Sequence, residues 1–255
     1  MGVGLLKRMV SKALAKYVHA LHLKKYRLRH GAFLVEGGKS VLELLRSGLQ
    51  TERVLVTAEF APKLPAGRSN LPVDILTEAE LTGLGTLATN NTGLAIARLP
   101  TELPLQPAAS GLLLALDQVR DPGNLGTLIR LADWYGLPGV VLSETCADPW
   151  APKTVAATMG SFTRVPVWQR ELPAWLGTLP ANLPVFGADL HGDNVHQLTL
   201  EPAGVLVMGS ESHGLTPEVE ARLTQRLHIP GRGQAESLNV AISAAILLDN
   251  FYRNS

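Results

Sequence analysis

The sequence predicts an α/β protein of two domains, the second built on a mostly parallel sheet. Three observations lead to this class. Short apolar segments bounded by turn residues alternate with helical patterns along the chain. GLLLAL (111–116), a helical segment at 124–135 and GVVLS (139–143) form a βαβ unit, and a run as apolar as GLLLAL is typical of a strand buried on both faces. A Pro-rich, weakly charged stretch at 100–111 separates two differently patterned regions.

The N-terminal region, residues 1–100, is predicted to be a small α/β domain. Apolar residues at helical spacing indicate helices, and short β-branched runs indicate strands. In chain order we expect a basic helix to about Leu23, a strand at 32–37, a helix at 39–48, strands at 53–58 and 73–77, a helix at 78–84 and a strand at 93–98. A linker at 101–111 follows this domain.

The C-terminal region, residues 112–255, is predicted to continue the βαβ alternation. After the first unit we expect strands at 165–168, 183–190, 204–209 and 227–230. We expect helices near 151–159, 171–178, 217–226 and 238–252. This alternation of strands and helices favours a mostly parallel sheet.

Charge is distributed unevenly, although the formal net charge is only +1. Residues 1–30 hold eight Lys and Arg and no Asp or Glu, which leaves 15 basic against 22 acidic residues in the remainder. This asymmetry suggests a surface for phosphate groups at one end of the molecule, with a merely solvated helix face as the equal alternative. The segment with Lys24, Lys25, Arg27 and Arg29 is the densest part of it.

Composition excludes several classes of protein. With 255 residues and 46% hydrophobic content, the chain can bury a full core. A lone Cys146 excludes a disulfide framework and a cysteine-based zinc site, and His191 and His196 have no identifiable ligand partner, so we expect no metal. No apolar run approaches the roughly 18 residues that span a bilayer, so we expect a soluble protein without a membrane partner. The basic start leaves a mitochondrial presequence open.

Three turns after predicted strands carry polar residues, and the carboxyl ends of parallel strands meet at one edge of a sheet. In the first turn (117–130), Asn124 is predicted to cap a helix that presents Arg130. In the second (207–215), Gly209 permits close approach of a backbone or ligand, and Glu211 supplies a carboxylate. Thr216 is predicted to cap the next helix.

The third turn (229–240) lies before the most apolar helix of the chain. Ser237 is predicted to be the cap of this helix. Capping by Ser237 leaves Asn239 unexplained, because Asn is a mediocre helix former in a first turn. Free N–H groups at a helix start favour anionic or electron-rich groups, so we infer that something binds there.

The three turns contain the motifs N-x-G-x-x-x-R at 124–130, G-S-E-x-x-G-L at 209–215 and I-P-x-x-G-x-x-x-S-L-N-V at 229–240, which cover the C-terminal domain. In order and spacing these motifs resemble those of the SpoU/TrmH family of SPOUT RNA ribose 2′-O-methyltransferases. The segment KKYRLRHGAFLVEG (24–37) is similar to the ribosomal-protein-like substrate-binding domain of many such enzymes.

The resemblance implies a trefoil knot, a homodimer and S-adenosylmethionine as cofactor, without a metal. It assigns catalytic importance to Asn124, Arg130, Glu211, Ser237 and Asn239. It places cofactor contacts near Gly209, Ile229 and Leu238, and RNA contacts at Lys24, Lys25, Arg27 and Arg29. Because a guanidinium stays protonated, we interpret Arg130 as a clamp on RNA, with Glu211 or water as the proton acceptor.

The implied substrate is structured RNA, first large-subunit (23S-type) ribosomal RNA and second transfer RNA, in the bacterial cytoplasm or the mitochondrial matrix. Two other classes are a non-catalytic RNA-binding assembly factor of the same fold and a serine hydrolase. The hydrolase would use Ser212, but Ser210 replaces the first glycine of its motif. A Rossmann methyltransferase is disfavoured because no G-x-G-x-G follows the first strand of either domain.

Overall fold

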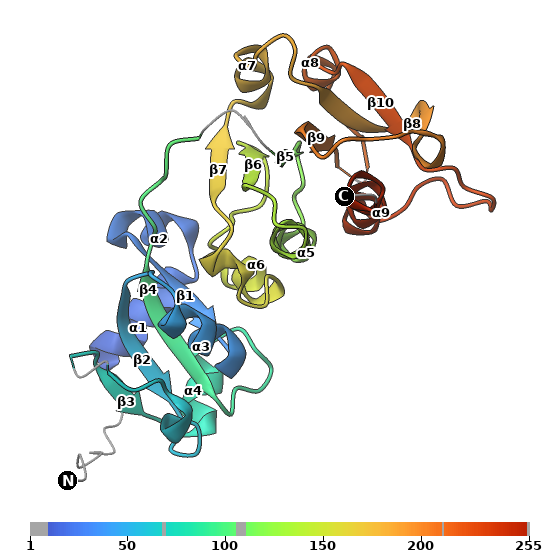
Figure 1. Ribbon diagram of the computed structural model, residues 1–255. Helices are drawn as coiled ribbons and strands as arrows, with labels where there is room; N and C mark the ends of the chain where they lie inside the picture. The colour runs from blue at the N-terminus through green and yellow to red at the C-terminus, as the bar shows by residue number, and fades with distance from the viewer. Residues whose placement is uncertain (1–9, 68–69, 106–110, 211, 254–255) are drawn as a thin grey trace. The chain divides into compact units, whose positions relative to one another are not determined.

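The chain passes three times between two structural units, drawn as ribbons in Figure 1. The computed structural model describes residues 10–67, 70–105, 111–210 and 212–253. The first unit comprises Met1–Thr101 and Asp148–Arg164, and the second comprises Glu102–Ala147 and Val165–Ser255. Each unit has its own sheet and its own buried apolar clusters.

A four-stranded sheet forms the centre of the first unit. Its order is β1-β4-β2-β3, with β4 antiparallel to β1 and β2, and β3 parallel to β2. The strands are β1 (Ala32–Glu36), β2 (Thr51–Val56), β3 (Val73–Ile75) and β4 (Gly93–Arg98). The helices are α1 (Lys12–Leu21), α2 (Lys24–His30), α3 (Gly38–Arg46), η1 (Ala61–Lys63) and α4 (Glu78–Leu84). The predicted strands and helices occur in the predicted order, and the helices α2 and η1 are additional to the prediction.

Both faces of this sheet are buried, because successive side chains of a strand point to opposite sides. Phe33 and Val35 of β1 pack with the apolar residues of α3. Leu34, between them, packs with the buried residues of α1 and α4. The sheet is therefore a middle layer between two groups of helices.

The basic segment folds as two helices, where the sequence predicted one. Leu23 is extended (φ −101°, ψ 131°) and is the N-cap of α2. Arg27 Nη1 donates hydrogen bonds to the carbonyl oxygens of Leu21 (2.9 Å) and His22 (2.8 Å). Carbonyl groups at the end of α1 lack helical partners, and these bonds satisfy two of them. The break is therefore stabilised by a side chain from the following helix.

Residues 148–164 pack in the first unit, although the sequence placed them in a continuous C-terminal domain. They form α6 (Pro152–Ala157) and η2 (Ser161–Thr163). The ring of Phe33 lies 4.8 Å from that of Trp150 and 5.9 Å from that of Phe162, measured between centroids. This segment therefore completes the apolar core on the α3 face of the first sheet.

Six strands, all parallel, form the sheet of the second unit in the order β10-β8-β9-β5-β6-β7. The strands are β5 (Leu112–Leu116), β6 (Val140–Ser143), β7 (Val167–Arg170), β8 (Val185–Asn194), β9 (Gly204–Met208) and β10 (Gln225–His228). The helices are α5 (Pro122–Trp134), α7 (Leu172–Gly177), η3 (Val195–Gln197), α8 (Pro217–Glu220) and α9 (Val240–Tyr252). The predicted parallel α/β class is confirmed.

The central strand β5 is buried on both faces, as its continuous apolar run predicted. Leu112, Leu114 and Leu116 pack with residues of α5 and α9. Leu113 and Ala115 pack with residues of α7 and α8. The helices α5 and α9 thus lie together on one side of the sheet.

Two helix predictions in the second unit are wrong in extent. The helix predicted at 217–226 ends at Glu220, because Gln225–His228 instead pair with β8 as an edge strand. The last helix begins at Val240, two residues later than predicted. None of the helices in the described ranges is both long and apolar enough to cross a membrane.

The predicted linker is partly attached to the second unit. Leu103 O accepts a hydrogen bond from Trp168 Nε1 (2.7 Å), and Glu102 pairs with Arg170 (2.5 Å). Leu105 packs partly buried against the α7 side of the second core. Residues 106–110 of the predicted linker lie outside the described residues.

Candidate active site

The three predicted turns meet at one edge of the second sheet. The strands that precede them, β5, β9 and β10, are parallel and end at Leu116, Met208 and His228. Their carboxyl ends therefore point to the same edge, where ligands collect in open parallel sheets. Because β8 and β9 lie between β10 and β5, the chain after His228 must pass the ends of both strands to reach α5.

Asn124 and Asn239 are brought together at this edge, although they are 115 residues apart. Asn239 Nδ2 donates a hydrogen bond to Asn124 Oδ1 at 3.0 Å. The first and third motifs therefore converge, and two amide side chains join the beginnings of α5 and α9.

Asp121, not Asn124, is the N-cap of α5. Asp121 Oδ1 accepts a hydrogen bond from the backbone N–H of Asn124 at 2.8 Å, and Pro122 occupies the first helical position. The prediction that Asn124 caps the helix is therefore wrong. An Asp followed by Pro is the stronger start signal, since Pro has no N–H to satisfy and a preset φ. Asn124 thus lies inside the first turn.

Asn239 is the N-cap of α9, and the prediction that Ser237 caps it is wrong. Asn239 Oδ1 accepts from the backbone N–H of Ala241 (2.9 Å) and Ile242 (3.4 Å). Ser237 is exposed, two residues before the cap. Asn239 therefore has two roles, because its oxygen caps the helix while its Nδ2 is directed at Asn124.

Arg130 lies on the exposed side of α5, six residues after Asn124. This separation corresponds to about 9 Å along the helix axis. The structure therefore does not bring Arg130 into the Asn124–Asn239 pair. Trp134, one helical turn further, is 82% exposed.

The second motif forms a tight turn after β9. Ser210 and Gly214 exchange two backbone hydrogen bonds (3.0 and 2.9 Å). A Cβ atom on Gly209 would collide with the backbone of Gly214 and Leu215. The close approach predicted at Gly209 is thus occupied by the chain itself. Glu211 lies outside the described residues.

Ser212, the nucleophile of the rival hydrolase hypothesis, is exposed. Its Oγ lies 2.7 Å from Nδ1 of the adjacent His213, which is exposed as well. The serine therefore lies within the exposed turn and not on the sharp strand-to-helix elbow that hydrolases of this type use.

The three predicted cofactor contacts lie around the same edge. Gly209 follows β9, and Ile229 follows β10 and packs partly buried against the α5–α9 core. Leu238 immediately precedes the cap Asn239 and is 46% exposed. An exposed leucine beside two half-buried strand ends offers apolar surface near the Asn124–Asn239 pair.

Asp117 belongs to this edge and was missed by the sequence reasoning. It follows β5 directly, is 3% exposed, and accepts hydrogen bonds at Oδ2 from Thr216 N (2.7 Å) and Thr216 Oγ1 (2.8 Å). Thr216 stands at the predicted N-cap position of α8, but its side chain makes no capping bond. An acidic residue directly after a fully apolar strand was the signal that could have identified Asp117.

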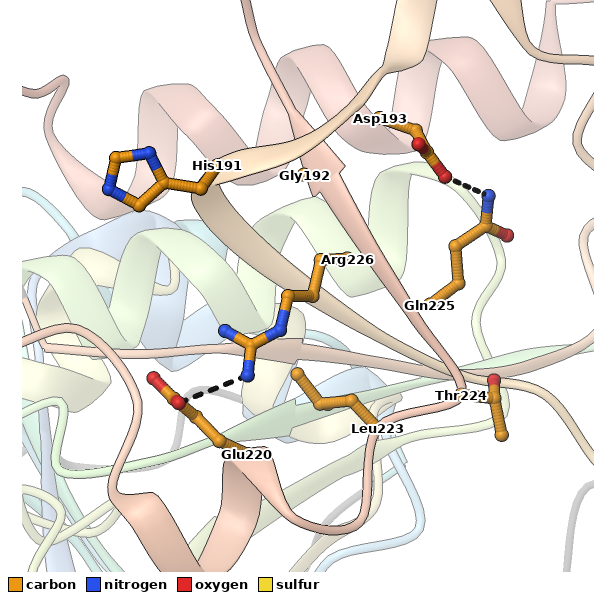
Figure 2. A pocket seen from close by; sticks show the side chains of 8 residues that line it. All are labelled: His191, Gly192, Asp193, Glu220, Leu223, Thr224, Gln225 and Arg226. Carbon is orange, nitrogen blue, oxygen red and sulfur yellow. Dashed lines mark hydrogen bonds and ion pairs between the residues drawn. The ribbon is translucent and has the colours of Figure 1, made fainter.

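A separate groove of about 460 Å³, shown in Figure 2, lies along β8 and the start of β10. Arg226 is one of its lining residues and pairs with Asp189 and with Glu220 (3.1 Å). Burial raises the pKa of Asp189, but hydrogen bonds from His191 N and Arg226 lower it below its ordinary value overall. None of the predicted site residues lines the groove, so we do not assign it to the site. The lining residues are His191, Gly192, Asp193, Glu220, Leu223, Thr224, Gln225 and Arg226.

The predicted RNA-binding residues of α2 fall into two groups. Lys24, Lys25 and Arg29 are exposed. Arg27 is 3% exposed, and its Nη2 forms an ion pair with Asp148 at 2.6 Å. The prediction that Arg27 contacts RNA is therefore wrong, since this side chain joins α2 to the 148–164 segment. No three His, Cys, Asp or Glu side chains of the described ranges lie close enough together to hold a metal ion.

Comparison with known proteins agrees with this arrangement. Residues 111–249 match the model of the SpoU rRNA Methylase family. The chain belongs to this family. Residues 12–93 of this SpoU-family protein also match a model described as the MRM3-like substrate binding domain.

Relatives of this SpoU-family protein extend over both units. It is 34% identical over 231 residues to RlmP of Bacillus subtilis, a 23S rRNA (guanosine(2553)-2′-O)-methyltransferase, covering 89% of this chain and 91% of RlmP. A solved TrmH-family structure from Porphyromonas gingivalis has 37% identity and a TM-score of 0.87, covering 97% of this chain and 100% of that one. An AdoMet-bound rRNA methyltransferase from Sinorhizobium meliloti has 29% identity and a TM-score of 0.83, covering 96% and 97%.

Proposed function

We propose that this SpoU-family protein transfers a methyl group from S-adenosylmethionine to a ribose 2′-oxygen of ribosomal RNA. The observation that carries the proposal is the Asn124–Asn239 hydrogen bond, which joins two distant family motifs at the edge where ligands bind. RlmP, with 34% identity, is named for the same reaction on 23S rRNA, and the Sinorhizobium relative was solved with AdoMet bound.

The residues of this edge fit the proposed cofactor. Exposed Leu238 and half-buried Ile229 supply apolar contact for an adenine ring, and the backbone near Gly209 lies where β9 ends. Small-molecule sites commonly combine such apolar walls with a few polar groups that fix orientation. When bound, S-adenosylmethionine supplies a methyl group already activated by its positive sulfur.

The protein's own residues then orient the ribose and move one proton. The amides of Asn124 and Asn239 are held by each other and by the start of α9, so they are positioned before RNA binds. Arg130 stays protonated and is proposed to hold a phosphate or ribose oxygen of the target nucleotide. Glu211 is the carboxylate proposed to accept the proton of the 2′-hydroxyl, with water as the alternative, and exposed Ser237 is proposed to contact the substrate.

The first unit is proposed to capture the RNA. Lys24, Lys25 and Arg29 present three exposed cations on one short helix, and residues 12–93 match a substrate-binding domain model. Contacts of this kind bind phosphates without reading sequence, so they position a structured RNA.

Two finer features are proposed for the second unit. Trp134 on α5 and Ile242 on α9 are 82% and 54% exposed on helices that pack together, and a second copy of the chain is proposed to cover them as a homodimer. The segment after His228 passes the ends of β8 and β9 before Asn239 reaches Asn124. We propose that this passage is the threading step of a trefoil knot.

The location follows from the proposed substrate. A relative from Bacillus subtilis supports the bacterial cytoplasm. The mitochondrial rRNA methyltransferase 3 of Xenopus laevis is 28% identical over 312 residues, so the mitochondrial matrix is the second proposal.

Transfer of a labelled methyl group from S-adenosylmethionine to unmodified ribosomal RNA by the purified protein tests the proposal. Mapping of 2′-O-methyl positions in total RNA with and without the protein then identifies the nucleotide. Methylation confined to transfer RNA would contradict the substrate. A protein that binds RNA but, by calorimetry, no cofactor would be an assembly factor instead.

A further inference from the structure

We infer that Asp117 and Thr216 form a positioning pair. The pair holds the end of the second motif against the segment that leads from β5 to the first motif, and it thereby sets the affinity for S-adenosylmethionine. The inference rests on the proposed function, because it concerns the same edge of the sheet. Neither residue belongs to the three motifs, and neither is proposed to touch the substrate.

Asp117 is a buried carboxylate with a specific partner. Its backbone N–H donates to Met208 O (2.8 Å), so it lies beside the last residue of β9. Its Oδ2 receives both the N–H and the hydroxyl of Thr216, at 2.7 and 2.8 Å. Hydrogen bonds to a charged acceptor are roughly twice as strong as neutral ones, and burial protects them from competition with water.

Thr216 uses its hydroxyl in an unusual way. Its backbone angles (φ −72°, ψ 150°) are those of an N-cap residue of α8, yet its side chain makes no capping bond. A threonine at this position normally caps its own helix. Here the hydroxyl donates to Asp117 instead. Thr216 therefore does not cap α8 but bonds a residue that lies 99 positions earlier in the chain.

The pair anchors the C-terminal end of the second motif. The turn leaves β9 at Gly209, is drawn together by the Ser210–Gly214 bonds, and is anchored again where Thr216 meets Asp117. Leu215, just before the anchor, is buried in the α7–α8 core. If the anchor is lost, the backbone of Gly209 and its neighbours loses one of its two attachment points.

The same pair is continuous with the first motif. Gln118, next to Asp117, has a left-handed backbone (φ 57°), which a non-glycine residue rarely adopts. Its N–H donates to Ser143 Oγ (2.9 Å) on the neighbouring strand β6. The chain then reaches the cap Asp121 and Asn124, so a movement of Asp117 would displace the beginning of α5 as well.

The opposite end of the sheet offers a matched control. Thr224 Oγ1 accepts from Val185 N (2.9 Å) and donates to Val185 O (3.1 Å), and so holds the start of β10 beside the start of β8. Thr224 and Thr216 therefore both use a hydroxyl to hold a distant segment, at the two ends of one sheet, although Thr224 bonds a neutral backbone and Thr216 a carboxylate. Only the tether of Thr216 lies at the edge with the motifs.

The experiment compares Thr216→Val, Thr224→Val and Asp117→Asn in the full-length protein, with Thr216→Ser as the conservative replacement. Cofactor affinity is measured by calorimetry with S-adenosylmethionine alone, kcat and KM by methyl transfer to RNA, and stability by Tm. We expect Thr216→Val and Asp117→Asn to raise the Kd for S-adenosylmethionine about tenfold or more, as loss of a charge-assisted hydrogen bond would. Thr216→Ser should restore it.

Thr224→Val should also lower Tm, because a strand tether is lost, and it should leave the Kd for S-adenosylmethionine unchanged. Equal losses of Tm in the two valine variants, with the Kd and kcat of both unchanged, would overturn the inference. A wild-type protein that binds no S-adenosylmethionine would overturn the proposed function, and the inference with it.

Discussion

The motif edge of the second unit and helix α2 of the first unit use their polar residues in opposite ways. At the motif edge, neutral amides are held by hydrogen bonds to each other and to a helix start, as in Asn124 and Asn239. On α2, the long cations Lys24, Lys25 and Arg29 extend into solvent, and only Arg27 is fixed. The amide side chains at the edge are therefore positioned before a ligand arrives, whereas the exposed cationic side chains of α2 are not.

This difference separates geometry from affinity. A reacting group must be held close to its productive position. Short side chains that are already hydrogen-bonded in the free protein lose little conformational entropy when a ligand binds. Phosphate recognition tolerates many geometries, because it depends mainly on charge and the release of counterions. Substitutions of the amide pair should therefore change the rate of methyl transfer, and substitutions of the exposed cations of α2 should change RNA affinity.

Arg130→Ala tests the largest expected effect of the edge. Loss of the proposed clamp should lower the rate of methyl transfer at least about a hundredfold, since the target nucleotide would no longer be held in line. The Kd for S-adenosylmethionine should stay close to the wild-type value. Arg222→Ala, at an exposed arginine just before β10, is the control and should leave the rate unchanged. A large loss of cofactor affinity in Arg130→Ala would move Arg130 into the cofactor site.

Asn239 allows its two roles to be separated. Asn239→Asp keeps an oxygen that can cap α9 but has no N–H to donate to Asn124. It should retain the wild-type Tm and lose about tenfold or more in single-turnover methyl transfer, by the usual contribution of a hydrogen bond to orientation. Asn239→Ala should lose the same activity and, in addition, about 1 kcal/mol of stability from the missing cap. A fully active Asp variant would contradict the role of the amide pair.

The exposed cations of α2 should affect binding alone. Replacement of Lys24, Lys25 and Arg29 by Ala should weaken RNA binding about tenfold and reduce the slope of log affinity against log salt by about 2. Filter binding across a salt series measures both quantities. Arg27→Met is the contrasting variant, because it leaves Asp148 without its buried partner and should lower Tm instead. A normal Tm with a reduced salt slope in Arg27→Met would return Arg27 to the RNA surface.

Much of the architecture was accessible from the sequence, because its strongest signals are local. The apolar run of β5 predicted a strand buried on both faces, and the structure confirms it. The packing of 148–164 was not accessible. Val155 and Phe162 are apolar and would suit either core. Two contacts with the first unit decide between the cores: Phe162 packs against Phe33, and Asp148 pairs with Arg27. Sequence spacing contains no information about which of two cores a helix enters.

The sequence predicted the location of the site more accurately than the hydrogen bonds within it. The order of the motifs and the parallel sheet were enough to predict that Asn124 and Asn239 lie at one edge, and they share a hydrogen bond there. The cap assignments of Asn124 and Ser237 were wrong, because each competes with another good cap residue within a few positions: Asp121 for α5 and Asn239 for α9. Asp117 was missed because its partner Thr216 is 99 residues away.

The smallest effect is expected from a change at Tyr17, which tests whether packing within the first unit holds α2 in place. Tyr17 of α1 donates a hydrogen bond to Glu52 Oε2 (3.0 Å) and packs edge-on against His30 of α2. Burial, followed by the charge and hydrogen bond of Glu52, raises the pKa of Tyr17 to about 12. Folding therefore favours the neutral phenol, and this stabilisation is complete below pH 10 and is lost as the pH rises towards 12.

Tyr17→Phe should accordingly lower the free energy of unfolding at neutral pH by about 1 kcal/mol, the usual contribution of one hydrogen bond. Between pH 10 and pH 12 the wild type should lose stability more steeply than the variant, which denaturant unfolding at several pH values measures. RNA affinity should change little in the variant, because the exposed cations of α2 are untouched. If Tyr17→Phe instead weakened RNA binding as much as the triple alanine variant, α2 would depend on prior ordering by its neighbours, and the contrast with the motif edge would fail.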